Sequence, residues 1–315
     1  MIVVTGADGF VGTALAAQLR LTGRRFRGLV RAFKADLAAA PEHQAVGDLA
    51  TISDETLVSA LAGADVIVHL AGRAHVMRKR LLDPARAYHE ANVVATERLA
   101  HAASRAGVRR IVFVSSIKVN GETTSPGRPF RADNPPRPHD HYAKSKRDAE
   151  QMLTDIARAS GMSLAILRPP LMYGPRVRGN FLTLWRAVAR GVPLPLGRID
   201  NRRHLLYVGN LVHAIVALID GAAGGGTWLI ADRESVSTPE LARRIAAALR
   251  QRARLVPLPV GLLKFAATAA GQRALVPRLT DSLEVDASPL AARIGPLPYS
   301  LDEGLADTAA WWASR

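Results

Sequence analysis

The chain opens with Met1-Ile2-Val3-Val4-Thr5-Gly6-Ala7-Asp8-Gly9-Phe10-Val11-Gly12. The apolar run before the glycines predicts a short β-strand, and Leu15 and Leu19 behind them have helical spacing. A strand, a glycine turn and a helix favour dinucleotide binding, because the turn lets the backbone approach a pyrophosphate at the helix N-terminus. A purely structural turn is the alternative. We expect cofactor contacts from Gly6, Gly9, Phe10, Val11 and Gly12.

Further apolar runs predict a parallel sheet with helices between its strands. Strands are expected at 26–30, 64–69, 110–116 and 164–167, with a long helix at 88–106. This alternation is typical of an α/β fold, a doubly wound parallel sheet of the Rossmann type. The strand at 64–69 contains His69, interpreted as a core histidine, and leads into a small-residue turn beneath the cofactor: Leu70, Ala71 and Gly72. Asn92, on the long helix, is also assigned to the cofactor site, where its amide would brace the active-site helix.

Arg31 ends the second predicted strand, 19 residues beyond Gly12. An acidic residue at this position would hydrogen-bond the adenosine ribose of NAD, whereas an arginine can pair with a 2′-phosphate. The residue therefore favours NADP(H), with NAD(H) and a merely exposed arginine as alternatives. Asp48 could accept a hydrogen bond from the adenine amino group or cap the following helix, and Leu49 is placed beside it.

Tyr142 and Lys146 lie four residues apart, so both side chains leave one face of a predicted helix at 142–160. A phenol has a pKa of about 10, and a nearby ammonium would bring it closer to neutral pH. The pair suits proton transfer at a carbinol or carbonyl oxygen, although a solvated helix face would give the same spacing. Ser115 and Ser116 end a predicted strand, where parallel sheets face their ligands.

Composition excludes several classes of function. There is no cysteine, the nine histidines show no metal-ligand spacing, and no apolar run is long enough to span a bilayer. We therefore expect no metal site and no membrane span, and we expect a cytoplasmic location because no signal peptide is visible at the start. The net charge of +15 comes from arginines scattered along the chain without an aromatic ladder, so no nucleic-acid partner is predicted. An amphipathic segment at 258–270 is expected to pack on the second domain, with membrane-surface contact as the alternative.

Taken together, these motifs resemble the extended short-chain dehydrogenase/reductase family, and most closely its bacterial nucleotide-sugar epimerases and 4-ketoreductases. The matching pieces cover residues 1 to about 210 in the family's order: Thr5-Gly6-x-x-Gly9-x-x-Gly12, His69-Leu70-Ala71-Gly72, Asn92-Val93, Val114-Ser115-Ser116, Tyr142-x-x-x-Lys146, Arg168-Pro169-Pro170 and Tyr173-Gly174-Pro175.

The resemblance implies roles for individual residues. Tyr142 would be the proton donor or acceptor, Lys146 its partner and a ligand of the nicotinamide ribose, and Ser116 the group that holds the reacting oxygen. Pro169 would follow the nicotinamide, and Ser115 belongs to the cofactor site. The nucleotide-sugar phosphates would be bound by Asn180 and Arg203. A basic loop containing His75 either lines the substrate cleft or is simply exposed to solvent.

The resemblance also implies a division into two domains. Residues 1–175, together with about 205–235, would form the Rossmann domain, and residues 176–204 and 236–315 would form the smaller nucleotide-sugar-binding domain. We expect a homodimer through the helices at about 88–106 and 142–160.

The expected activity is that of an NADP(H)-dependent reductase acting at C4 of a UDP-linked 4-keto-6-deoxy-N-acetylhexosamine, in the supply of O-antigen sugars. Dehydration is disfavoured because Ile117-Lys118 stands where the family's 4,6-dehydratases have Asp-Glu. An NAD-dependent 4-epimerase of UDP-glucose or UDP-N-acetylglucosamine would use the same residues and is the alternative. A non-catalytic nucleotide sensor is the minor alternative.

Overall fold

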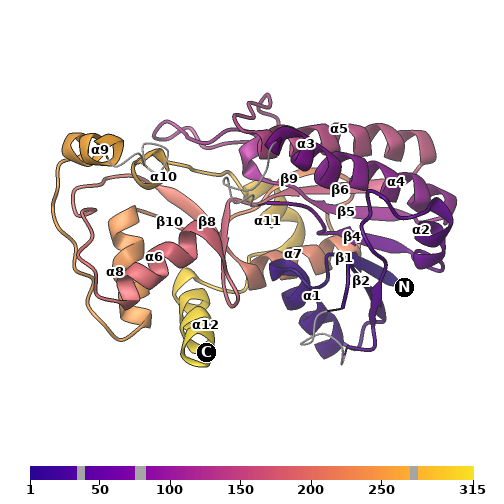
Figure 1. The fold of residues 1–315 in the computed structure, drawn as a ribbon, viewed down its shortest axis with the longest axis horizontal. Helices are drawn as coiled ribbons and strands as arrows, with labels where there is room; N and C mark the ends of the chain where they lie inside the picture. The colour runs from indigo at the N-terminus through magenta and orange to yellow at the C-terminus, as the bar shows by residue number, and fades with distance from the viewer. Residues whose placement is uncertain (34–39, 75–82, 270–275) are drawn as a thin grey trace.

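The computed structural model describes residues 1–33, 40–74, 83–269 and 276–315. Its centre is a seven-stranded parallel sheet with the order β3-β2-β1-β4-β5-β6-β9 (Figure 1). The strands are β1 (Ile2–Thr5), β2 (Phe26–Val30), β3 (His43–Ala45), β4 (Val66–His69), β5 (Arg110–Val114), β6 (Ser163–Arg168) and β9 (Gly226–Leu229). The reversal of strand order beside β1 makes the sheet doubly wound, as predicted.

Helices cover both faces of this sheet and create two cores. On one face, α1 (Phe10–Leu21) and α7 (Val208–Ile219) bury Leu15 and Leu211. On the other face lie α2 (Asp54–Ala60), α4 (Ala95–Arg105) and α5 (His141–Ser160), with Leu99 and Leu153 in their core. Strands buried on both faces need apolar side chains throughout, and Val3 and the other residues of β1 are accordingly buried.

The long helix predicted at 88–106 differs from the prediction in its start and in its geometry. It begins with α3 (Pro84–His89), continues through a π-helical segment at Glu90–Val94, and ends with α4. Asp83 caps its start, accepting a hydrogen bond from the backbone of Arg86. The π segment contains Asn92, and π-helical turns of this kind occur most often at functional sites.

The remaining elements gather at one end of the sheet (Figure 1). They comprise a three-stranded sheet, β10-β8-β7, and the helices around it. The bounds are β7 (Leu171–Tyr173), α6 (Gly179–Ala189), β8 (Arg203–Tyr207), β10 (Ser235–Val236), α8 (Thr238–Ala248), α9 (Val260–Ala269), α10 (Val276–Thr280), α11 (Ser288–Ile294) and α12 (Leu301–Ala313). The residue-by-residue division into two domains stays a prediction. Within the described residues, no helix is both long enough and apolar enough to cross a bilayer.

Candidate active site

The residues predicted to hold a cofactor follow the ends of six neighbouring strands. The glycine turn follows β1, Arg31 follows β2 and Asp48 lies shortly after β3, while the other three positions follow β4, β5 and β6: Leu70, Ser115 and Pro169. Because the strands are parallel and adjacent, these positions meet at one edge of the sheet, which we call the carboxyl edge.

The glycine turn has the geometry of a cradle for a pyrophosphate. Gly6 has a φ of +65°, and a Cβ there would lie 2.8 Å from the backbone nitrogen of Ala71. A Cβ on Gly12 would lie 2.2 Å from the carbonyl oxygen of Gly6, so neither position accepts a side chain. Gly9 is the N-cap of α1 and makes no side-chain cap, which leaves the first N–H groups of that helix available to an anion. The turn therefore fits the dinucleotide that the sequence predicts.

At the adenosine end of this edge, Arg31 forms an ion pair with Asp48, with 3.1 Å between the guanidinium and the carboxylate. The second carboxylate oxygen of Asp48 accepts a hydrogen bond from the backbone N–H of Ala50 at 3.0 Å. Both charged side chains remain substantially exposed, and Leu49 is buried beside them. The positive charge of Arg31 is thus partly neutralised within the protein, a pairing that the sequence analysis did not anticipate.

Ser115 and Ser116 stand at the end of β5, held by the neighbouring strand. The backbone N–H of Ser115 donates to Leu167 at 2.7 Å, and that of Ile117 donates to Pro169 at 2.9 Å. The Ser115 hydroxyl is buried without a hydrogen-bond partner among the described residues. A buried hydroxyl in that state fits contact with a bound ligand.

Tyr142 lies half-buried on the first turn of α5, close to Ser116. Burial raises the pKa of the phenol to about 12, the Ser116 hydroxyl opposes this rise, and the nearby Asp140 carboxylate adds to it. Burial thus raises the pKa of the phenol, whereas the sequence analysis expected Lys146 to lower it. The phenol is protonated at neutral pH and can donate a proton.

Lys146, one turn after Tyr142 on α5, is buried against the end of β5. Its ammonium donates to the carbonyl of Val114 at 2.8 Å and lies 4.0 Å from the ring centre of Phe113. Burial lowers the pKa of this lysine to about 7, and the carboxylate of Glu150 partly offsets the effect. A buried lysine whose pKa is lowered in this way is a candidate functional residue rather than an ordinary solvated surface lysine.

A chain of buried hydrogen bonds begins at the end of β1. The Thr5 hydroxyl accepts from the backbone N–H groups of Leu70 and Ala71, which leaves its proton for Nδ1 of His69 at 2.7 Å. Nε2 of His69 lies 2.9 Å from the hydroxyl of Thr96. Burial lowers the pKa of His69 to about 3, so the ring is neutral and serves as a fixed link. His69 is the core histidine that the sequence predicts.

The chain continues through Asn92 to the helix of Tyr142. The hydroxyl of Thr96 donates to the backbone carbonyl of Asn92 at 2.6 Å. The Asn92 amide donates to the hydroxyl of Ser145 at 2.9 Å and also bonds both backbone groups of Arg73. Ser145 in turn donates to the carbonyl of Tyr142 at 2.8 Å. Asn92 therefore braces the helix that carries the phenol, as expected.

The residues predicted to bind substrate are less enclosed. Asn180 is exposed on the first turn of α6, a helix without a side-chain N-cap. Arg203 is partly buried at the start of β8, donates to the carbonyl of Asp281 at 2.7 Å and has its pKa lowered by burial. His75 lies outside the described residues.

One cluster at this edge was missed by the sequence analysis. Arg168, at the end of β6, and Glu150, on α5, form a buried ion pair with guanidinium–carboxylate distances of 3.0 and 3.2 Å from Nε. Asn120 completes it, since its side-chain oxygen accepts from Arg168 at 3.0 Å. The polar Asn120 between Val119 and Gly121 was the available signal.

A second missed cluster surrounds Lys118. Its ammonium binds the carboxylates of Glu122 at 2.9 Å and Asp140 at 2.6 Å. Asp140 also caps α5 by accepting from Ala143, so the cluster fixes the start of the helix of Tyr142. Lys118 thus holds α5 in place and brings no acid–base pair to the site.

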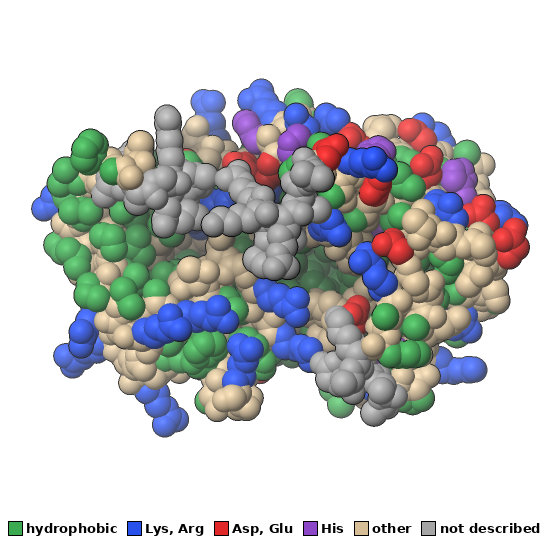
Figure 2. All heavy atoms as spheres, viewed as in Figure 1, with side chains coloured by type: hydrophobic (Ala, Val, Ile, Leu, Met, Phe, Trp, Pro, Cys, Tyr) green, Lys and Arg blue, Asp and Glu red, His purple; other side chains and the backbone are tan. Residues whose placement is uncertain are grey.

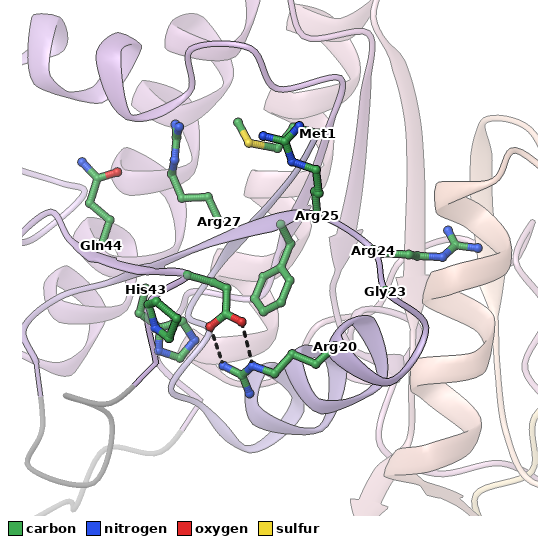
Figure 3. Close-up of a pocket in the computed structure, with 11 residues that line it drawn as sticks. Met1, Arg20, Gly23, Arg24, Arg25, Arg27, His43 and Gln44 are labelled. Carbon is green, nitrogen blue, oxygen red and sulfur yellow. Dashed lines mark hydrogen bonds and ion pairs between the residues drawn. The ribbon is translucent and has the colours of Figure 1, made fainter.

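A pocket at the opposite, amino edge of the sheet is basic, and three of its four arginines are bonded within the protein. It has a volume of about 780 Å³ and includes Arg20, Arg24 and Arg27 (Figure 3). Figure 3 shows Arg20 paired with the carboxylate of Glu42, at 3.1 Å for both bonds. Arg24 pairs with Asp220, and Arg27 donates to the carbonyl of Ala60. Because these guanidinium groups are already engaged, we place the functional site at the carboxyl edge instead. Among the described residues, no group of three potential metal ligands occurs.

The fold and site define an enzyme of the extended short-chain dehydrogenase/reductase type. A model of the NAD dependent epimerase/dehydratase family matches residues 2–231. The chain belongs to this family, whose members depend on NAD(H).

Individual relatives place the chain among nucleotide-sugar enzymes. It is 40% identical to a UDP-glucose 4-epimerase of Vibrio cholerae over 313 residues, covering 98% of this chain and 94% of the relative. It is 28% identical to an N-acetyl-alpha-D-glucosaminyl-diphospho-ditrans,octacis-undecaprenol 4-epimerase of Escherichia coli O157:H7, covering 96% and 92%. The structure of MoeE5 in complex with UDP-glucuronic acid and NAD matches with a TM-score of 0.78 and 27% identity, covering 99% of both chains.

Proposed function

We propose that this enzyme is an NAD-dependent 4-epimerase of a UDP-linked hexose. The observation that carries the proposal is the convergence of Ser116, Tyr142 and Lys146 at the carboxyl edge, in a chain 40% identical to a UDP-glucose 4-epimerase. The sequence analysis ranked the epimerase second to the reductase, and the comparisons favour the epimerase. The sensor alternative falls because the family and the relatives are enzymes.

The chain's own residues would perform the proton chemistry. Tyr142 in its phenolate form would accept the proton of the C4 hydroxyl when the sugar is oxidised and would return it when the 4-keto group is reduced, and Ser116 beside it would hold that oxygen by a hydrogen bond. The Lys146 ammonium below would favour the phenolate form when the proton leaves. The α1 N-terminus and the glycine turn would hold the cofactor pyrophosphate. NAD, when bound, supplies a reversible acceptor for the hydrogen at C4.

We propose NAD rather than NADP as the cofactor. The prediction of NADP(H) rested on Arg31, but Arg31 is paired with Asp48, whose carboxylate would repel a 2′-phosphate. A UDP-sugar-binding relative has been solved with NAD. A thermal-shift comparison of NAD and NADP tests this choice, and stronger stabilisation by NADP would reverse it.

The sharpest test of the activity follows UDP-glucose and UDP-galactose with catalytic amounts of NAD. We expect interconversion from both directions without net accumulation of NADH, and none in a Tyr142→Phe variant that still binds NAD. Steady consumption of NAD(P)H with a UDP-4-keto sugar, and no interconversion of UDP-hexoses, would instead establish the reductase. That second candidate rests on the motif resemblance to O-antigen sugar reductases and uses the same three residues.

The homodimer also remains a proposal. Helices α4 and α5 pack side by side on one face of the sheet, and their outer sides are available to a second copy. Sedimentation velocity of the purified chain tests this, and a monomer at all concentrations would contradict it.

A further inference from the structure

The net positive charge of the chain is concentrated at one end of the molecule. Arginine occurs throughout the sequence, but two segments, 176–199 and 241–280, contain no acidic residue at all. The first segment has five basic residues and the second has eight, and residues 176–204 and 236–315 as a whole carry a formal charge of +9 out of +15, from seventeen basic and eight acidic residues. The described residues of both segments belong to the end of the molecule that holds α6, α8 and α9 (Figure 1).

The same end exposes large apolar side chains. On α9, Leu262 is 55% exposed and Phe265 is 74% exposed. Val192 and Val256 are each 44% exposed. Val192 lies on the loop after α6, and Val256 lies on the loop between α8 and α9. The sequence analysis expected the segment to pack on the second domain, and for Leu262 and Phe265 that expectation is wrong. Exposed Leu and Phe side chains close together mark an interaction surface.

The two loops form a continuous surface. Backbone N–H groups of Leu194 and Gly197 donate to the carbonyls of Arg254 and Val256, at 2.8 and 3.0 Å. These bonds hold the loop that contains Val192 against the loop that contains Val256, and the chain beyond Val256 leads directly into α9. Exposed Arg252 and Arg254 lie on the same loop and form no ion pair within the described residues. We call this set the outer-end surface: Val192, Arg252, Arg254, Val256, Leu262 and Phe265.

Figure 2 shows the character of this end directly. Around the position of α9, the described side chains in view are green and blue, and red acidic side chains gather toward the other end. Apolar side chains that project beside unpaired arginines suit a lipid bilayer, which has an apolar acyl-chain region beneath negatively charged headgroups. A protein partner would need acidic groups and an apolar pocket in matching positions, whereas a bilayer offers both everywhere.

We propose that the outer-end surface binds peripherally to an anionic lipid bilayer. Leu262 and Phe265 enter the interface between headgroups and acyl chains, and Arg252 and Arg254 contact the lipid phosphates. The helix lies on the membrane and does not cross it, in keeping with its length of 10 residues. This inference is independent of the proposed epimerase activity.

The test is cosedimentation of the full chain with vesicles of phosphatidylcholine, with and without about one third phosphatidylglycerol. We expect binding to the anionic vesicles that weakens as salt rises, and little binding to the neutral ones. A Leu262→Glu/Phe265→Glu double variant should lose at least about tenfold in partitioning, because it removes the inserted groups and adds repelling charges. Arg252→Gln/Arg254→Gln should lose roughly twenty-fivefold, at about a factor of five for each arginine.

The matched control is Leu21→Glu, at the end of α1 in the other part of the molecule. Leu21 is 81% exposed, so this change adds a similar charge at an equally accessible apolar position. It should leave vesicle binding unchanged, and all variants should retain turnover of UDP-sugars in solution. Equal loss in the control, or no binding by the parent chain, overturns the proposal. So does a double variant that changes the sedimentation coefficient without vesicles, since the surface would then join two copies of the chain.

Discussion

The carboxyl and amino edges of the central sheet hold charged groups in opposite ways. At the carboxyl edge, Lys146, Glu150 and Arg168 are each buried, and the lysine has no carboxylate bonded to it among the described residues. At the amino edge, Arg24 and Asp220 pair at the surface, with 32% and 49% of their side chains exposed. Buried charges respond strongly to their surroundings, whereas exposed pairs are screened by water. The chemistry is therefore expected at the edge where desolvation perturbs the pKa values.

Among substitutions that test this difference between the two edges, the largest expected effect is a loss of turnover at the carboxyl edge. Tyr142→Phe removes the phenolic hydroxyl that bonds to Ser116 while keeping the ring, so turnover of the UDP-sugar should fall by about 10³-fold. Binding of NAD, followed by thermal shift, should be retained. A variant that keeps more than a tenth of the parent turnover would remove Tyr142 from the proton transfer.

Loss of the buried ion pair should have the largest effect on stability. Glu150→Ala leaves the Arg168 guanidinium buried beside Asn120 alone, which should cost about 3–5 kcal/mol in the free energy of unfolding. Urea denaturation measures this cost. The matched control is Glu90→Ala, which breaks an exposed pair with Arg86 and should cost under about 1 kcal/mol. A similar loss in the free energy of unfolding for both variants would contradict the expected difference between buried and exposed ion pairs.

Lys146→Met should abolish turnover and yet stabilise the protein at neutral pH by about 1–2 kcal/mol, because a buried ammonium is replaced by an apolar chain. The pKa of Lys146 is about 7 in the folded protein, below the ordinary 10.5. Between these two pH values the unfolded parent chain binds more protons than the folded one, so the parent gains stability as pH rises. The difference in free energy of unfolding between Lys146→Met and the parent should therefore shrink. Denaturation at pH 7 and pH 10 measures it; an unchanged or wider gap at pH 10 would mean that the folded-state pKa is not lowered.

The smallest effect is expected at the amino edge. Arg24→Ser breaks the surface pair with Asp220 and should change the free energy of unfolding by less than about 1 kcal/mol, with no change in turnover. A loss of activity in this variant would show that the basic pocket of Figure 3 contributes to function.

The sequence predicted those parts of the fold and site that local patterns encode. The strand before Gly6 and the helical spacing of Tyr142 and Lys146 depend on residues within a few positions of one another. The pair of Glu150 and Arg168 joins positions 18 residues apart on different elements, and no local periodicity specifies it. The same holds for Arg31 and Asp48, whose pairing reverses the argument for NADP(H). Epimerase and reductase could not be distinguished because both use one set of proton-transferring groups.

The π-helical turn at Glu90–Val94 contains one residue more than the corresponding turn of an α-helix. An α-helix advances about 100° with each residue, so the insertion turns everything upstream by that angle relative to α4. Tyr88 thereby comes to lie with its ring 5.9 Å from that of Tyr142. Deleting a single residue from this segment would restore a regular helix and swing Tyr88 away from the phenol. A backbone irregularity of one residue thus decides which side chain of this helix lies beside Tyr142.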